Sequence, residues 1–392
     1  MPAVRIARII SRLNLGGPAR QILASDPLLQ ERGHEVRLFA GQPEPGEGDL
    51  FEAAQREGLD CVRVPGLKRG IAPASDWRAR RFLTRELKAF RPEVVHTHAS
   101  KAGALGRPAA QRGTQARSVH TFHGHVLEGY FPEAISKRLI ALEQKLARTT
   151  DRIVCVSHAT ADDLVRLGVC TEERITVVPT GVQRDPLLSI GRPHGPKGEL
   201  RELLEVGSEA VIVGVVGRLA EVKRVDLALE VFTLLAERYA DLHVVFVGDG
   251  DQRGHLERLR AALPESQRER VHLLGAVSDL LPIWADVDVL LMTSRTEGLP
   301  VAVIEAAAAG IPTCATSVGG LPELVAHERT GFLGEDATEL AFGLARYLDD
   351  PVERRASGAR ARLRVAERHG AGALADRLEG LYQTLCEEPQ RT

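Results

Sequence analysis

Residues 294–305 read SRTEGLPVAVIE and follow an apolar run, VDVLLM, at residues 287–292. An apolar run of this length predicts a buried strand, and the small apolar residues that continue to Ala309 predict a helix. Pro300 suits the first helical position, because its missing N–H would have no intrahelical partner there. We therefore expect a strand, a tight loop and a helix whose free N–H groups favour a phosphate.

Two glutamates frame this loop, with seven residues between them. Glu297 is expected in the loop, where a carboxylate can hold sugar hydroxyls. Glu305 is expected about one and a half turns into the helix, where a second carboxylate can hold a ribose. The alternative is that Glu297 caps the helix and Glu305 is a solvated helix residue. The apolar neighbours of Glu305 disfavour a solvated face.

The 392 residues are enough for two or three domains of ordinary globular composition. Aromatic residues make up only 4%, which argues against a base-stacking nucleic-acid binder. Residues 1–185 carry 28 Lys and Arg against 21 Asp and Glu (+7), and the rest carry the other 23 and 32 (−9). A basic first half predicts an anionic partner or a membrane surface. A scatter of surface charge without function is the alternative.

The five cysteines are odd in number and lack C-x-x-C spacing. This pattern indicates a reducing compartment and argues against a metal site or a disulfide frame. Arg5 and Arg8 interrupt the apolar stretch at residues 4–10, so no signal-peptide pattern is present. No apolar run is long enough to cross a bilayer. The sequence therefore predicts a cytoplasmic protein that is at most peripheral on the inner face of the cell membrane.

Short apolar runs alternate with helical segments in both halves of the chain, which predicts open parallel sheets. Residues 183–198 are rich in Gly and Pro and form the best linker. Helices are expected over most of residues 336–387. The expected strands are 4–10, 35–40, 61–64, 93–98, 118–125, 152–157 and 175–178 before the linker, and 211–216, 243–247, 271–274, 287–292 and 312–315 after it.

Two further motifs of the first half stand near expected strand ends. Gly16 and Gly17 precede a helix begun by Pro18, and adjacent glycines let a backbone approach a ligand closely. The motif is not G-x-G-x-x-G, so no nicotinamide site is expected, and a simple strand-to-helix turn is the alternative. Histidines also gather at two expected strand ends, where parallel sheets present ligand sites. His123 before Gly124 is the best candidate, although a lone histidine is more often structural.

Residues 77–90 predict a basic amphipathic helix. Such a helix can lie on anionic lipid headgroups. An ordinary surface helix with its apolar side on the core is the favoured alternative.

Arg218 and Lys223 leave one expected strand end through a short loop that starts at Gly217. Two cations there suit a diphosphate, which Arg binds with a planar fork and Lys as a point charge. Each charge-assisted bond contributes about 1.5–3 kcal/mol. A solvated cationic turn is the alternative. With Glu297 and Glu305, these cations predict a site for a nucleoside diphosphate attached to a polyhydroxy group.

Taken together, the chain resembles a retaining glycosyltransferase of family 4. The resemblance implies an α/β chain with the GT-B fold, in which two Rossmann-like domains with parallel sheets face each other across a cleft. The implied domains are an acceptor-binding domain at 1–185 and a nucleotide-sugar-binding domain at 199–368, with a C-terminal helix at 369–392 that crosses back to the first. The matching motifs, in family order, are Gly16-Gly17, His123-Gly124, Gly217-Arg218 with Lys223, Glu297-Gly298-Leu299-Pro300 through Glu305, and Gly319-Gly320-Leu321-Pro322-Glu323.

The resemblance implies a role for each side chain of these motifs. Arg218 and Lys223 would neutralise the leaving diphosphate. Glu305 would bind the ribose, and Glu297 would contact the donor sugar. His123 would face the reacting sugar.

Six further positions are implied to contact the donor. Gly16 and Gly17 would approach its diphosphate. Backbone N–H groups around Gly298, Leu299 and Pro300 would meet phosphate or sugar oxygens. Val277 would lie near the base. The sequence departs from the family pattern at Arg224, where glycine is usual, and at Thr180, where asparagine is common. The six positions are Gly16, Gly17, Val277, Gly298, Leu299 and Pro300.

The reaction implied is front-face transfer with retention, without a metal or a bound cofactor. A nucleoside-diphosphate sugar, with UDP favoured, is the co-substrate, and its hexosyl or N-acetylhexosaminyl group passes to a hydroxyl acceptor. Asp286 and Asp288 straddle the start of a strand and Asp249 and Asp251 form a turn, so neither pair is placed like a metal site.

The acceptor is expected in surface polysaccharide or glycolipid assembly. A basic first half fits a lipid-linked acceptor and contact with an anionic membrane, and a soluble acceptor stays open. No nucleic-acid partner is expected. A non-hydrolysing sugar-nucleotide epimerase of the same fold and a non-catalytic sugar-nucleotide-binding protein are the alternatives.

Overall fold

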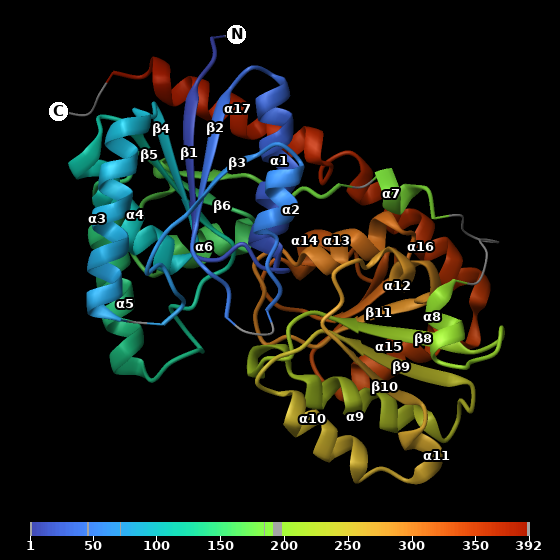
Figure 1. The fold of residues 1–392 in the computed structure, drawn as a ribbon. Coiled ribbons are helices and arrows are strands. Elements are labelled where there is room, and N and C mark those ends of the chain that lie inside the picture. The colour runs from blue at the N-terminus through green and yellow to red at the C-terminus, as the bar shows by residue number, and fades with distance from the viewer. Residues whose placement is uncertain (1, 45–46, 71, 184, 191–197, 390–392) are drawn as a thin grey trace. The chain divides into compact units, whose positions relative to one another are not determined.

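A computed structural model describes residues 2–44, 47–70, 72–183, 185–190 and 198–389 (Figure 1). The chain forms two compact units. Unit 1 comprises Met1–Gly181 with Ala371–Thr392, and unit 2 comprises Val182–Gly370. Residues 184 and 191–197 of the expected linker lie outside the described residues.

The sheet of unit 1 has seven parallel strands in the order β3-β2-β1-β4-β5-β6-β7. Strands β1, β4 and β5 are buried along almost their whole length, as expected where helices cover both faces of a parallel sheet. The strand order reverses between β1 and β4, and ligands bind beyond the carboxyl ends of strands at such a switch point. The strands are β1 (Arg5–Ile10), β2 (Glu35–Ala40), β3 (Asp60–Arg63), β4 (Val94–His98), β5 (Arg117–Phe122), β6 (Arg152–Cys155) and β7 (Ile175–Val177).

The last helix, α17, returns to unit 1 and lies beside α1 (Figure 1). Leu374 and Leu378 of α17 join a core cluster with Ile6 of β1. Arg32, which ends α1, pairs with Asp376 at 2.6 Å and with Glu379 at 2.7 Å. The helices of unit 1 are α1 (Gly17–Glu31), α2 (Phe51–Arg56), α3 (Pro73–Phe90), α4 (Ser100–Gly113), α5 (Glu133–Arg148), α6 (His158–Arg166) and α17 (Ala371–Glu387), with a 3-10 turn over Glu172–Arg174.

The sheet of unit 2 has six parallel strands in the order β10-β9-β8-β11-β12-β13, with its switch point between β8 and β11. Strand β13 was not expected, because it has four residues with a glycine at each end, and glycine weakens a strand pattern. The strands are β8 (Val211–Val216), β9 (Leu242–Val247), β10 (Val271–Gly275), β11 (Val289–Met292), β12 (Thr313–Thr316) and β13 (Gly331–Gly334).

Helices cover this second sheet as well, and a core cluster of the unit lies between its strands, α9 and α15. The helices are α7 (Asp185–Leu188), α8 (Glu199–Leu203), α9 (Val225–Ala236), α10 (Arg253–Ala261), α11 (Glu265–Arg268), α12 (Leu281–Asp286), α13 (Val301–Ala308), α14 (Leu321–Leu324), α15 (Ala337–Asp349) and α16 (Pro351–Ala366), with a 3-10 turn over Glu221–Lys223.

A buried cation lies inside unit 1. Arg8 of β1 has no exposed surface and pairs with Asp26 of α1 at 3.3 Å. Its guanidinium also donates a hydrogen bond to the hydroxyl of Tyr382 in α17. A buried charge is costly unless it is paired and hydrogen-bonded. Arg8 therefore ties β1, α1 and the returning helix together.

We expect Asp26→Ala to lower the free energy of unfolding by about 3–5 kcal/mol, because it leaves a buried guanidinium without its counter-charge. Urea unfolding of the whole chain, followed by circular dichroism, measures the change. Asp376→Ala is the matched control, since it removes an exposed partner of Arg32 and should cost less than about 1 kcal/mol. Equal losses in the two variants would contradict a structural role for the buried pair.

Candidate functional site

Two loops of unit 2 are tied together at the switch point of its sheet, one following β8 and the other following β11. The hydroxyl of Thr293 lies 3.0 Å from the carbonyl oxygen of Lys223 and 2.9 Å from that of Arg224, which share its hydrogen bond. The N–H of Arg295 donates to the carbonyl oxygen of Val222 at 2.8 Å. These bonds fix the backbone of one loop against the other.

Lys223 and Glu297 form an ion pair across the two loops, between Nζ and Oε1. The hydroxyl of Ser294 donates to the same carboxylate oxygen at 2.5 Å. The Lys223 side chain is 28% exposed and that of Glu297 10% exposed. The cation predicted to meet a phosphate and the carboxylate predicted to meet a sugar therefore lie side by side, with the cation more open to solvent.

Glycines allow the backbones of these loops to approach one another closely. The N–H of Gly320 donates to the carbonyl oxygen of Glu297 at 3.2 Å. Gly319 has a φ of +52°, and a Cβ on it would lie 1.9 Å from that same oxygen, so only glycine fits there. A Cβ on Gly248, after β9, would lie 1.9 Å from the carbonyl oxygen of Gly217. Sequence reasoning gave Gly248 no role, because a glycine after a strand indicates only a turn.

Helix α13 carries the second glutamate. Glu305 is buried, with 6% of its surface exposed, so the alternative of a solvated helix residue is wrong. The N-cap residue of this helix is Pro300, so Glu297 is not its N-cap. Pro300 has an extended ψ of 122°, and the helix begins one residue later than predicted. Gly298 and Leu299 are buried beside it.

The remaining residues predicted in unit 2 lie on neighbouring loops. Arg218 is exposed on the loop that also carries Lys223. Arg224 on this loop has a φ of +48° and a ψ of 57°. This left-handed conformation costs a residue other than glycine about 1–2 kcal/mol, which explains why glycine suits the position. Val277 is half-buried after β10, two strands away from β8. Thr180, the other departure, is buried in unit 1.

Unit 1 carries the other predicted residues at the carboxyl edge of its sheet. Gly16 is the N-cap of α1 and Gly17 is its first residue. His123 follows β5, and its Nε2 lies 3.0 Å from Nδ1 of His98, which ends β4. Burial, with a smaller effect of positive Arg8, lowers the pKa of His123 to about 3. The ring is therefore neutral at physiological pH.

The predicted residues thus form one group in each unit. In unit 2, Lys223 and Glu297 are in direct contact, Arg218 lies on the loop of Lys223, and Glu305 lies on the helix that follows Glu297. In unit 1, the glycine loop and His123 follow strands of the same sheet, at the same edge.

Asp286 and Asp288 serve the fold. Asp286 accepts hydrogen bonds from the backbone N–H groups of Gly198 at 2.8 Å and Arg201 at 3.1 Å. Asp288 pairs with the Arg201 guanidinium at 2.9 Å. Within the described residues, no group of three or more His, Cys, Asp or Glu side chains is placed to hold a metal ion.

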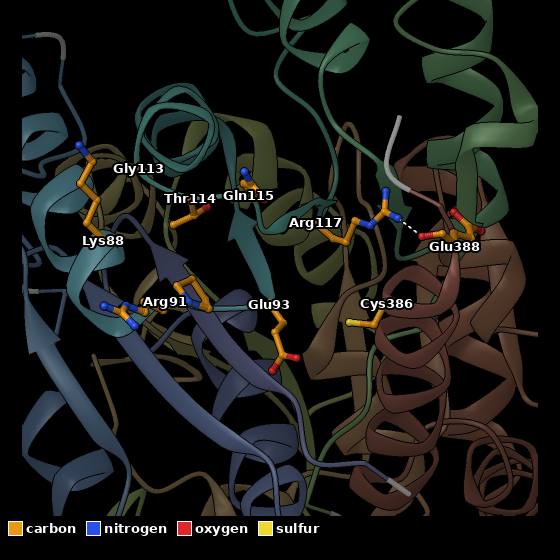
Figure 2. Close-up of a pocket in the computed structure, with 10 residues that line it drawn as sticks. Lys88, Arg91, Glu93, Gly113, Thr114, Gln115, Arg117, Cys386 and Glu388 are labelled. Atoms are coloured by element: carbon orange, nitrogen blue, oxygen red, sulfur yellow. Dashed lines mark hydrogen bonds between the residues drawn. The ribbon is translucent and has the colours of Figure 1, made fainter. Parts of the chain in front are cut away.

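A pocket of about 370 Å³ in unit 1 lies away from the predicted site (Figure 2). Glu93 precedes β4 and Arg117 begins β5, so the pocket is at the amino edge of the sheet, opposite His123. Figure 2 shows the Arg117 guanidinium bonded to the backbone carbonyl of Glu388. Ligands of such sheets bind at the carboxyl edge, so this pocket is not the candidate site. Its lining is Lys88, Arg91, Pro92, Glu93, Gly113, Thr114, Gln115, Arg117, Cys386 and Glu388.

Two family models match the chain. A model described as Glycosyltransferase Family 4 matches residues 15–185. A model described as Glycosyl transferases group 1 matches residues 210–350. The first match includes every site residue predicted in unit 1, and the second includes every one predicted in unit 2.

Curated relatives align over most of the chain. UDP-Gal:alpha-D-GlcNAc-diphosphoundecaprenol alpha-1,3-galactosyltransferase of Escherichia coli is 28% identical over 354 residues, which are 89% of each chain. D-inositol 3-phosphate glycosyltransferase of Xylanimonas cellulosilytica is 30% identical over 377 residues, which are 88% of this chain and 87% of the relative. Both relatives are named as glycosyltransferases.

Solved structures share the architecture. Anabaena Alr3699/HepE in complex with UDP and glucose aligns with a TM-score of 0.81 at 18% identity, over 97% of this chain and 100% of the other. WaaG, a glycosyltransferase involved in lipopolysaccharide biosynthesis, aligns with a TM-score of 0.73 at 19% identity, over 98% and 100%. With the two parallel sheets, these likenesses confirm the expected GT-B fold.

We expect Gly319→Ala to lower turnover of a nucleotide sugar by about two orders of magnitude, because the added Cβ displaces the Glu297 backbone, and a shift of about 1 Å at a site can cost that much. Gly380→Ala in α17 is the control, since its Cβ meets no atom within 4 Å. Both are assayed under the same conditions after circular dichroism. Parental activity in Gly319→Ala would show that the close approach of Gly319 to the Glu297 backbone is not required for turnover.

Proposed function

Because this chain belongs to glycosyltransferase family 4, we propose that it is a retaining enzyme that transfers a sugar from a UDP-sugar to a hydroxyl of a lipid-linked acceptor. The contact between Lys223 and Glu297 carries the proposal, because it sets a cation for the diphosphate beside a carboxylate for the sugar. The E. coli relative is named for UDP-galactose and a diphosphoundecaprenol-linked acceptor. The positive balance of residues 1–185 suits an acceptor with a diphosphate. Such a product belongs to surface polysaccharide or glycolipid assembly.

The donor is held by groups of unit 2. Lys223 and Arg218 bind the diphosphate oxygens, and Glu297 accepts hydrogen bonds from hydroxyls of the sugar. Glu305, which is buried, accepts hydrogen bonds from the ribose. The start of α13 adds backbone N–H groups and a positive dipole end.

The reaction takes place on one face of the sugar. The bond between the anomeric carbon and the β-phosphate oxygen breaks, and its electron pair stays on the phosphate. The acceptor hydroxyl forms the new bond from the same face and passes its proton to the leaving phosphate oxygen. Lys223 and Arg218 stabilise the charge that develops there, which is the main contribution of the protein. We propose that neither a metal nor a bound cofactor takes part.

The relatives named above are glycosyltransferases, which favours transfer over the epimerase and over the non-catalytic binding protein. An epimerase would interconvert free nucleotide sugars, and a binding protein would release no UDP. Both alternatives are therefore separated from a transferase by product analysis.

Helix α3, the basic helix expected at residues 77–90, is a poor membrane surface. Its apolar side packs on the core of unit 1, with Leu83, Leu87 and Phe90 buried. Trp77 is exposed, and the Arg81 guanidinium lies 5.5 Å from its ring centroid. The structure therefore agrees with the ordinary surface helix that was the alternative.

Helix α5 offers a better membrane surface. Ile135 and Leu142 are 44% and 42% exposed and stand two turns apart on one face, and Phe131 just before the helix is 46% exposed. Arg138 and Lys145 are exposed at the intervening and following turns of that face. An apolar stripe flanked by cations is typical of a helix that lies in the interface of an anionic membrane. Among the described residues, no helix has the length and apolar character to span a bilayer.

We expect the purified enzyme to release UDP from one UDP-sugar of a UDP-, GDP- and ADP-sugar panel, and to form an α-linked product from an α-linked donor, as read by NMR of the anomeric proton. Lys223→Ala and Arg218→Ala should each lower turnover at least about 100-fold, in line with roughly 3–4 kcal/mol per preorganised contact. Lys68→Ala is the control at an exposed lysine. A β-linked product would overturn retention, and near-normal rates in both variants would overturn the site.

We expect the enzyme to float with vesicles that contain phosphatidylglycerol at low salt and not with phosphatidylcholine alone. The double variant Ile135→Glu/Leu142→Glu should lose flotation, because it removes the apolar stripe and repels anionic headgroups. Phe342→Glu/Leu363→Glu is the control, since it makes the same charge change at exposed apolar residues of unit 2. Flotation that survives the first double variant, or is lost in Trp77→Glu, would contradict a role for α5.

A further inference from the structure

We propose that His98 is a positioning residue that fixes the tautomer of His123, so that His123 offers its Nδ1–H to an oxygen of the substrate. The 3.0 Å contact between Nδ1 of His98 and Nε2 of His123 is the starting point. The surroundings of Nε2, the other ring nitrogen of His98, decide which of these two nitrogens carries the proton. This inference rests on the proposed function in one respect, because that function identifies the substrate oxygen as a hydroxyl of the transferred sugar.

The tautomer of His96 is set by buried Arg8. A guanidinium can only donate, and Nη1 of Arg8 lies 3.1 Å from Nδ1 of His96, so this nitrogen is an acceptor. The hydroxyl of Tyr382 contacts the same nitrogen at 2.7 Å. Neutral His96 therefore carries its proton on Nε2, which donates to the hydroxyl of Thr121 at 2.6 Å. Burial, and secondly the positive charge of Arg8, hold the pKa of His96 well below its ordinary value.

His98 lies between His96 and His123. Its ring stacks on that of His96, with centroids 4.3 Å apart and planes at 27°. The side chain is 1% exposed. Burial lowers the pKa of His98 well below its ordinary value, with smaller effects of His96 and Arg8. His98 and His123 are therefore both neutral, and each ring carries one N–H.

The second ring nitrogen of His98 decides the direction of the hydrogen bond. Nε2 of His98 is buried and has no hydrogen-bond partner among the described residues. If His123 donated, His98 would carry its proton on Nε2, as a buried N–H without an acceptor. If His98 donates, Nε2 holds only an unused lone pair. A buried N–H without a partner is rarer in proteins than a buried acceptor without one. His98 Nδ1–H is therefore the donor.

This direction leaves His123 with its own proton on Nδ1. His123 then acts as a neutral hydrogen-bond donor, and its Nδ1 cannot accept a proton from the acceptor hydroxyl. A sugar hydroxyl oxygen can accept the hydrogen bond that this donor offers. His123 therefore binds and orients the sugar, while the proton of the acceptor goes to the leaving phosphate.

The tautomer can be read in the whole chain without substrate. Long-range proton–nitrogen NMR correlation of the 15N-labelled protein distinguishes the protonated ring nitrogen, and His123→Gln assigns the signals of His123. We expect Nδ1–H at His123 in the parent chain. In His98→Asn the side-chain amide replaces the Nδ1–H donor and should keep this tautomer, whereas His98→Leu should convert His123 to a mixture with Nε2–H.

Kinetics give a second readout with the sugar donor that the enzyme turns over. His98→Leu should lower kcat/KM about tenfold, the size of one lost hydrogen bond, and His98→Asn should restore it. An Nε2–H tautomer of His123 in the parent chain, or an unchanged tautomer in a folded His98→Leu, would overturn the proposal. The expected tautomers without any sugar transfer would support the role of His98 and overturn the proposed function instead.

Discussion

The ion pair between Lys223 and Glu297 joins loops that follow two neighbouring strands, β8 and β11, of the second sheet. Contact between a cation and a carboxylate offsets part of the cost of their partial burial. Without this partner the lysine would not keep its position, because its side chain has many rotamers and would extend into water. The hydroxyl of Ser294, bonded to the same carboxylate, further restricts the pair. The geometry of the predicted donor site follows from this contact.

The backbone makes the contact possible. Both loops begin at the switch point of the sheet, between the adjacent strands β8 and β11. After β8 the chain continues toward one side of the sheet, and after β11 it continues toward the other. Gly319 and Gly248 let neighbouring loops approach so closely that a methyl group would overlap a carbonyl oxygen. Arg224 adopts a left-handed conformation that glycine would adopt without strain. The site therefore depends on small residues as much as on charged ones.

The sequence predicted what depends on local patterns. Within the described residues, apolar runs located twelve of the thirteen strands and missed β13, which has glycines at both ends. The apolar neighbours of Glu305 correctly indicated burial. Contacts between residues distant in the chain were beyond such patterns. His98 and His123 meet because β4 and β5 are neighbours, and the strand order is a property of the folded sheet.

An amphipathic pattern does not show what its apolar side contacts, as helices α3 and α5 of unit 1 illustrate. Helical periodicity shows that α3 has an apolar side, but the core and a membrane are both apolar, so the sequence cannot tell which one it meets. The buried Leu83 and Leu87 settle this for α3. In α5 two apolar residues, Ile135 and Leu142, are exposed although Leu146 and Ala147 of the same helix are buried.

The predicted site residues of the two units differ in charge. In unit 2 a compensated ion pair presents a lysine to solvent, which suits a ligand with a negative diphosphate. In unit 1, burial and secondly the positive charge of Arg8, which is paired with Asp26, lower the pKa of His96 and keep its ring neutral. Neutral rings at the sheet edge can donate to hydroxyls without repelling or attracting ions.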